Sequence, residues 1–191
     1  MSWIELPRMI VSSHAGWDKV ERTHPSARAM FLRLVLPMSL LPPAMILFAA
    51  SHVGAERFPG VAFETWILLA AAFLVLELLS VPAMAWIIRM VASDKGARTD
   101  EHDAFMVAAI APVPLWLSSL VLLQSHVWLI VVVPLLAMAA SAGLIRHGVE
   151  RMLHVDEEVA AEELSMIVIT IGILAWMVLI GIVLLPALMH G

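Results

Sequence analysis

Five long apolar runs constrain this chain more than any other feature of its sequence. A helix needs about 20 apolar residues to cross the roughly 30 Å of hydrocarbon in a bilayer. Strands of a membrane barrel would instead alternate apolar and polar residues over about ten positions, and these runs are continuous. The sequence therefore predicts an all-α polytopic integral membrane protein, a bundle of five transmembrane helices with proline kinks. The predicted spans are residues 30–50, 66–88, 104–123, 127–145 and 166–189.

Composition supports a membrane protein and excludes several function classes. Hydrophobic residues make up 62% of the 191 residues and charged residues 14%, which is outside the usual range of soluble domains. The spans leave room for one transmembrane domain, 30–189, and a cytoplasmic amino-terminal segment, 1–29. A net charge of -5 does not favour nucleic acid, and the absence of Cys excludes disulfides and thiolate metal sites. The expected partner is the lipid bilayer.

The amino-terminal segment has no continuous apolar stretch of the kind found in signal peptides, so we expect it to be retained. Two interpretations stay open for it. It lies along the headgroup boundary as a short interfacial segment, or it forms a partly ordered tail. The apolar residues that favour the interfacial interpretation are Trp3, Ile4, Leu6, Met9, Ile10, Val11 and Trp17.

Basic residues in the short connections predict the orientation, because Lys and Arg are retained on the cytoplasmic side. With five crossings, 10 of the 11 basic residues lie on one side of the membrane and only Arg57 lies on the other. This predicts a cytoplasmic amino terminus and an extracytoplasmic carboxyl terminus in the cell (inner) membrane. The ten residues are Arg8, Lys19, Arg22, Arg28, Arg33, Arg89, Lys95, Arg98, Arg146 and Arg151.

Glu77 stands at the midpoint of the second predicted span, where an ionised carboxylate is costly. Two interpretations remain open. Glu77 donates a hydrogen bond between helices as a neutral acid, or it handles protons or cations. The predicted buried polar site contains Glu77 with Ser80, Ser118, Ser119 and Ser141, and Ser39 and Thr170 supply further hydroxyl groups.

Proline occurs in every predicted span. Each proline removes a backbone donor and frees a carbonyl group, so we expect kinked helices. Such kinks either reflect packing irregularity or line a substrate cavity, as in transporters. The predicted kink positions are Pro37, Pro42, Pro43, Pro82, Pro112, Pro114 and Pro134, and Pro186 lies in the last span.

Two further patterns concern packing and charge. Ala139 and Gly143, four residues apart, permit close helix approach either within the bundle or in a homo-oligomer. After the fourth span, apolar residues at Val149, Met152 and Leu153 predict a prolongation of that helix. The acidic residues that follow lack the spacing of a calcium loop, and we expect them to form a solvated face: Asp156, Glu157, Glu158, Glu162 and Glu163.

Nothing in the sequence predicts an enzyme, a metal site or a cofactor. His52, His126 and His190 all fall at predicted outer helix ends, but they are dispersed and no His-Glu-x-x-His motif is present. No phosphate-binding glycine loop or nucleophile elbow occurs either. We therefore expect no metal, no cofactor and no enzymatic activity.

Three segments resemble the Yip family of five-span membrane proteins, named as Ypt-interacting proteins. They are VLPMSLLPPAMIL in the first span, DAFMVAAIAPVPLWLSSLV from Asp103 to Val121, and SAGLIRHGVERML at the end of the fourth. Pro114, Trp116 and Gly143 stand at positions that look like the family pattern, and the resemblance extends from about Leu6 to Leu188. A proline followed by Trp-Leu, as at Pro114, Trp116 and Leu117, is typical of bacterial members, so the resemblance implies a bacterial-type member. The Tyr-bearing motifs of eukaryotic members are missing, since the chain has no Tyr.

The resemblance implies a cytoplasmic amino-terminal segment followed by five spans. Eukaryotic members act as adaptors in vesicle trafficking through Rab-type GTPases. Two hypotheses for function follow from the residues and the resemblance together. The first is a non-enzymatic scaffold or adaptor that binds a protein partner or organises the membrane. The alternative is a small channel or proton-coupled transporter that uses the buried Glu77.

Overall fold

The computed structural model describes residues 17, 20, 22–54, 58, 60–97, 99–124, 126–153, 155 and 158–190. It is all-helical, and five of its helical stretches are long and apolar enough to cross a membrane. They are Ala27–His52, Phe63–Asp94, Glu101–Leu123, Trp128–Met152 and Val159–Leu185. The prediction of an all-α bundle with five spans is confirmed.

The first span is divided into short helical segments near its prolines. Pro37 cannot donate a backbone hydrogen bond, and its ring crowds the carbonyl group four residues before it. The turn before it is π-helical, with the Leu36 N–H bonded to the Phe31 carbonyl oxygen. Pro42 and Pro43 lie in the first turn of the next helix, where missing donors cost least. The segments are α3 (Ala27–Met30), η1 (Phe31–Val35), α4 (Leu36–Ser39), α5 (Leu41–Ala49) and η2 (Ala50–Gly54).

The third span is divided in the same way, and the other three run unbroken. Pro112 caps the start of a new helix and Pro114 lies in its first turn. The segments are α8 (Glu101–Ile110), α9 (Val113–Ser118) and η3 (Ser119–Leu123). The continuous helices are α7 (Phe63–Asp94), α10 (Val127–Met152) and α11 (Glu158–His190), and Pro82 and Pro134 lie inside α7 and α10.

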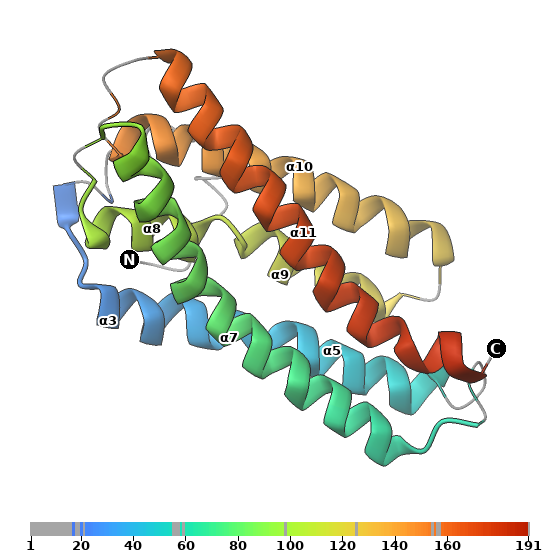
Figure 1. Ribbon diagram of the computed structural model, residues 1–191. Coiled ribbons are helices and arrows are strands. Elements are labelled where there is room, and N and C mark those ends of the chain that lie inside the picture. The colour runs from blue at the N-terminus through green and yellow to red at the C-terminus, as the bar shows by residue number, and fades with distance from the viewer. Residues whose placement is uncertain are drawn as a thin grey trace.

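The third span lies at the centre of the bundle. Of its most hydrophobic window, 61% is buried, against 6% for the fifth span. Its segments contact α3, α4, α5, α7 and α10, whereas α11 contacts mainly α7 and α10 and crosses the outside of the bundle (Figure 1). Large apolar side chains such as Leu68, Leu136 and Val178 are exposed on the outer helices. These exposed side chains form the surface that a helical bundle presents to lipid.

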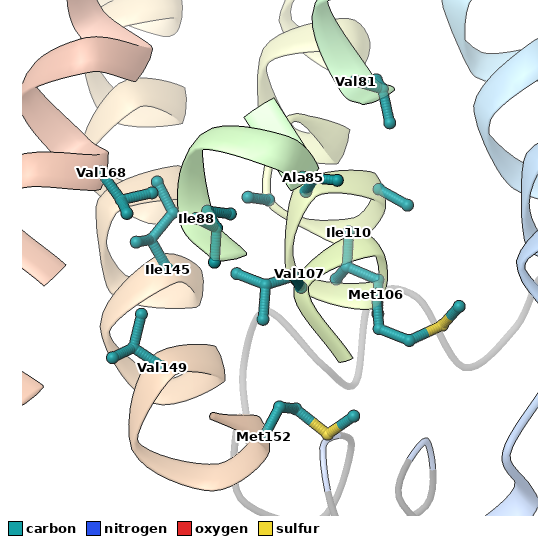
Figure 2. Packing of buried hydrophobic residues seen from close by; sticks show 14 of the residues in the cluster. Val81, Ala85, Ile88, Met106, Val107, Ile110, Ile145, Val149, Met152 and Val168 are labelled. Carbon is teal, nitrogen blue, oxygen red and sulfur yellow. The ribbon is translucent and has the colours of Figure 1, made fainter. Parts of the chain in front are cut away.

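The buried face of α7 organises the core. Its buried residues recur every three or four positions, as one helix face requires. Those before Glu77 pack with Ile46 and Ala50 of the first span, and those after it belong to a larger cluster that gathers side chains from α7, α8, α10 and α11 (Figure 2). The face consists of Trp66, Ala70, Phe73, Glu77, Val81, Ala85, Ile88 and Ala92.

Several helices continue beyond the predicted spans at one end of the bundle. α7 ends at Asp94, α10 ends at Met152, and α11 begins at Glu158. The fourth helix thus continues past residue 145, as its apolar residues Val149 and Met152 predict. We call this end of the bundle the charged end. It is formed by the start of α3, the end of α7, the start of α8, the end of α10 and the start of α11. It lies at the left of Figure 1.

Ion pairs join the helices of the charged end. Arg89 pairs with Glu101 at 3.3 Å, and Lys95 pairs with Glu163. Arg146 pairs with Glu162 at 3.3 Å and with Glu150 at 3.6 Å. These side chains are exposed, so each pair contributes about 0–1 kcal/mol. Glu162 and Glu163 of the acidic run are therefore solvated, as expected, and also ion-paired.

Trp17 and Trp116 are the largest fully buried side chains among the described residues, and Trp17 lies at the charged end. Its indole packs onto α10 where Gly148 leaves space: a Cβ atom on Gly148 would lie 2.8 Å from Trp17 Cζ2 and 3.2 Å from Val107. Trp17 itself has 0% exposure and packs against the helices, and the interfacial interpretation of the segment before it stays a prediction. Residues 1–16 of the predicted interfacial segment lie outside the described residues.

Candidate functional site

Glu77 lies in the middle of α7 on its buried face, and 5% of the residue is exposed. Phe73 precedes it by one turn in the smaller apolar cluster, and Val81 follows it by one turn in the larger cluster. Its carboxyl group is therefore held at the junction of two apolar clusters. A polar group in such a place destabilises the protein unless it is hydrogen-bonded.

The Trp116 indole lies beside the Glu77 carboxyl group, where its N–H can act as a donor. Trp116 lies on α9 in the central span and is 2% exposed. The position of Trp116 depends on the break at Pro112, because the helix of the third span resumes there as α9. The backbone N–H of Trp116 donates to the Pro112 carbonyl oxygen at 3.0 Å. The second carboxyl oxygen of Glu77, Oε2, is buried and has no hydrogen-bond partner. Glu77 and Trp116 thus join α7 to the central span.

The serine hydroxyl groups of the predicted polar site do not donate to the Glu77 carboxyl group. Ser118 and Ser119 each donate to a backbone carbonyl oxygen three residues earlier, at 2.7 Å, and Ser80 donates to the Glu77 backbone oxygen at 2.8 Å. Ser39 and Thr170 likewise bond to carbonyl groups of their own helices. Such local bonds are the usual choice of a helical Ser or Thr.

Ser141 is the exception among these hydroxyl groups. Its residue is 5% exposed, and its Oγ atom is buried without a hydrogen-bond partner. The structure therefore brings Glu77 together with Trp116. Ser141 forms no hydrogen bond, and Ser80, Ser118 and Ser119 donate to backbone oxygens one turn earlier in their own spans.

Trp116 is a residue of this site that the pattern of polar side chains in the sequence does not predict. An indole N–H is a donor that finds a partner when it is buried. The sequence signal for it is a Trp within a predicted span, at a depth near that of Glu77. Because the indole only donates, Trp116 cannot accept a proton from Glu77.

The comparison with known families covers most of the bundle and ends within α11. A family model described as the Yip1 domain matches residues 8–179. The chain belongs to the Yip1 family. Proteins of the Yip1 family are in general non-enzymatic membrane-trafficking proteins. Neither a curated protein nor a solved structure matches the chain. Trp116, which lies beside Glu77, is one of the positions that carry the family resemblance.

The outer histidines of this Yip1-family chain do not form a metal site in the part of the chain that the structure describes. No group of three or more His, Cys, Asp or Glu residues there is arranged to hold a metal ion. His52 is exposed and its Nδ1 atom lies 3.0 Å from the Phe48 carbonyl oxygen, and His126 is exposed at the start of α10. The side chain of His190 lies outside the described residues.

Close helix approach in the Yip1 bundle occurs at Gly148 rather than at Gly143. A Cβ atom on Gly143 would meet nothing within 4 Å, and Ala139 is exposed. The small residues at these two positions therefore do not bring helices together within the chain. The homo-oligomer that they also permit stays a prediction.

Proposed function

We propose that this Yip1-family chain is a non-enzymatic membrane scaffold whose charged end binds a protein partner or organises the bilayer. The observation that carries the proposal is the folded surface at that end. The helix ends there extend beyond the apolar spans, pack over the buried Trp17 and are joined by ion pairs. Four of the largest fully buried side chains, Trp17, Met152, Leu153 and Leu164, lie at this end.

The orientation in the proposal follows the basic residues. Arg28, Arg89, Lys95 and Arg146 lie at the charged end, and Lys and Arg of short connections are retained in the cytoplasm. The charged end then faces the cytoplasm and the carboxyl terminus lies outside, in the cell (inner) membrane. Hydrogen bonds add to the rigidity of this end: Thr99 donates to the Leu153 carbonyl oxygen at 3.0 Å.

The function is tested by placing a photo-crosslinking amino acid at Glu150 or Glu162 in cells that express the full chain. Both side chains are exposed at the charged end. We expect discrete protein adducts from these positions and only lipid adducts from Leu68 and Leu136, which are 71% and 66% exposed on the lipid-facing surface. The adducts are separated by electrophoresis and identified by mass spectrometry.

A charge swap provides the matched control. Lys95→Glu combined with Glu163→Lys keeps the ion pair between α7 and α11 but reverses the charge pattern of the surface. A partner that recognises this surface loses its adduct in the swapped variant. Protein adducts of equal intensity from the lipid-facing positions would remove the basis for a scaffold role of the charged end.

A second function, proton or cation transfer through Glu77, is favoured by one observation. The Oε2 atom of Glu77 is buried within the bundle without a partner, and acids at this depth often mark ion pathways. The test is flux into liposomes that contain the purified wild-type chain or Glu77→Gln. Since Trp116 cannot relay a proton, we expect both to give the background rate. A pH-dependent flux that Glu77→Gln abolishes would establish the transfer function instead.

A further inference from the structure

An open groove of about 360 Å³ lies at the charged end between the first and third spans. Its walls are apolar, and a single charged residue, Arg28, lies at its edge. The lining residues are Ala27, Arg28, Phe31, Leu32 and Phe105. Its volume lies within the range of about 300–1,000 Å³ that is usual for ligand sites.

The groove lies where a bilayer changes from acyl chains to headgroups. Phe31 and Phe105 each follow the start of their candidate spans, Ala27–His52 and Glu101–Leu123, by four residues. Four residues correspond to about 6 Å along a helix axis. The apolar walls therefore reach into the hydrocarbon, while Arg28, one residue after the start of its span, lies near the headgroups.

The π-helical turn Phe31–Val35 forms part of the groove. This turn precedes Pro37, and it carries both Phe31 and Leu32. Leu32 is 51% exposed, and Phe31 packs partly against the core. π-helical turns occur frequently at functional sites. The groove wall is thus a consequence of the proline that interrupts the first span.

Arg28 has no ion-pair partner among the described residues, although acidic side chains lie on the neighbouring helix. Glu101 pairs with Arg89, and Asp103 lies 3.3 Å from His102 Nδ1. Arg33, also exposed and outside the described ion pairs, adds a second positive charge to the same span. The edge of the groove therefore carries positive charge that the described protein residues do not neutralise.

We propose that this groove binds one anionic phospholipid. An acyl chain packs against Phe31, Leu32 and Phe105, and the phosphate accepts hydrogen bonds from the Arg28 guanidinium group, which matches phosphate oxygens well. A zwitterionic lipid fits less well because it would bring its own ammonium group close to Arg28. The site is independent of the proposed scaffold role, since it requires no protein partner and lies on the lipid-facing side of the first span.

Native mass spectrometry of the full chain, purified in detergent and stripped of lipid, tests the site. Phosphatidylglycerol and phosphatidylcholine with the same acyl chains are titrated separately. We expect one phosphatidylglycerol to be retained with a dissociation constant about tenfold lower than that of phosphatidylcholine. Arg28→Gln is expected to raise the dissociation constant of phosphatidylglycerol about tenfold, which is the size expected for a lost charge-assisted hydrogen bond.

Two further variants separate the groove from general surface charge. Ala27→Trp fills the groove and leaves Arg28 in place, so it should abolish retention, and its far-UV circular dichroism confirms that the chain is folded. Lys95→Gln removes the same charge at the same end but away from the groove, and it should bind phosphatidylglycerol like the wild type.

Several results would overturn the proposal. Equal retention of the two lipids by the wild type would show that the headgroup is not recognised. Equal losses in Arg28→Gln and Lys95→Gln would show that only net charge matters. Displacement of the lipid by millimolar inorganic phosphate would identify a site for free anions rather than for a lipid, and unchanged retention by a folded Ala27→Trp would place the lipid elsewhere.

Discussion

Replacement of Trp17 by alanine is expected to lower the free energy of unfolding by about 3–5 kcal/mol, the usual cost of removing a buried Trp. Trp17 has 0% exposure and fills the space left by Gly148 on α10. The alanine variant leaves a cavity that its neighbours, which belong to fixed helices, close only in part. The measurement is unfolding of the purified chain in detergent micelles, followed by far-UV circular dichroism, which does not depend on the removed indole.

Two other tryptophan variants provide controls for this prediction. Trp17→Phe keeps most of the ring volume, and the indole Nε1 atom has no hydrogen-bond partner to lose, so its cost should stay below about 1.5 kcal/mol. Trp86→Ala removes a side chain that is 64% exposed on the lipid-facing surface of α7, with an expected change within about 0.5 kcal/mol. Equal destabilisation by Trp17→Ala and Trp86→Ala would contradict the buried position of Trp17.

Gly148 tests the same contact from the opposite helix. Gly148→Val introduces side-chain atoms where Trp17 lies, and overpacking of this kind costs about 1–3 kcal/mol. Gly143→Ala is the matched control on the same helix, because its new Cβ atom meets nothing within 4 Å. That substitution should be neutral or slightly stabilising, since Ala favours a helix over Gly by about 1 kcal/mol.

The five spans could be predicted because bilayer thickness fixes the length of an apolar helix. The place of Trp17 could not be predicted in this way. A tryptophan in a mixed segment suits the headgroup boundary as well as a protein core. The choice depends on the space at Gly148, which is far away in the sequence. The end of α7 was also not predictable from hydropathy. The apolar run stops at the first charged residue, whereas the helix backbone continues past it to Asp94.

The position of Glu77 could be predicted from its depth in the second span, but its partner could not be predicted from polarity alone. Hydroxyl groups such as those of Ser118 and Ser119 find acceptors one turn back on their own helices. They are therefore not available to a distant acid. The partner of Glu77 depends on which face of α9 is presented after the break at Pro112, and this is set by tertiary packing.

The contact between Glu77 and Trp116 predicts a coupling that a double-mutant cycle can measure. Trp116→Phe keeps the ring and removes the N–H, so Glu77 loses its donor. Glu77→Leu removes the acceptor and leaves the indole N–H unpaired. Each single variant should cost about 1–3 kcal/mol, because it leaves a buried polar group without a partner. The variant with both changes leaves neither group, so its cost should be less than the sum of the two.

The expected coupling energy is about 0.6 kcal/mol, the average for hydrogen bonds between membrane helices, and at most about 1.7 kcal/mol. Unfolding of the four proteins is followed in the same micelles as for Trp17. Glu77→Gln keeps a side-chain oxygen as acceptor, so it should cost less than Glu77→Leu if the bond to Trp116 is what stabilises the bundle.

Serine variants show whether any loss is specific to this pair. Ser141→Ala removes a hydroxyl group that is buried without a partner, so it should be neutral or stabilising. Ser118→Ala removes a hydroxyl group that bonds only to its own helix backbone, and it should leave the coupling between Glu77 and Trp116 unchanged. The unfolding free-energy changes of the two single variants could instead add up to that of the double variant within about 0.3 kcal/mol. The pair would then not join α7 to the central span, and another donor would have to stabilise the buried acid.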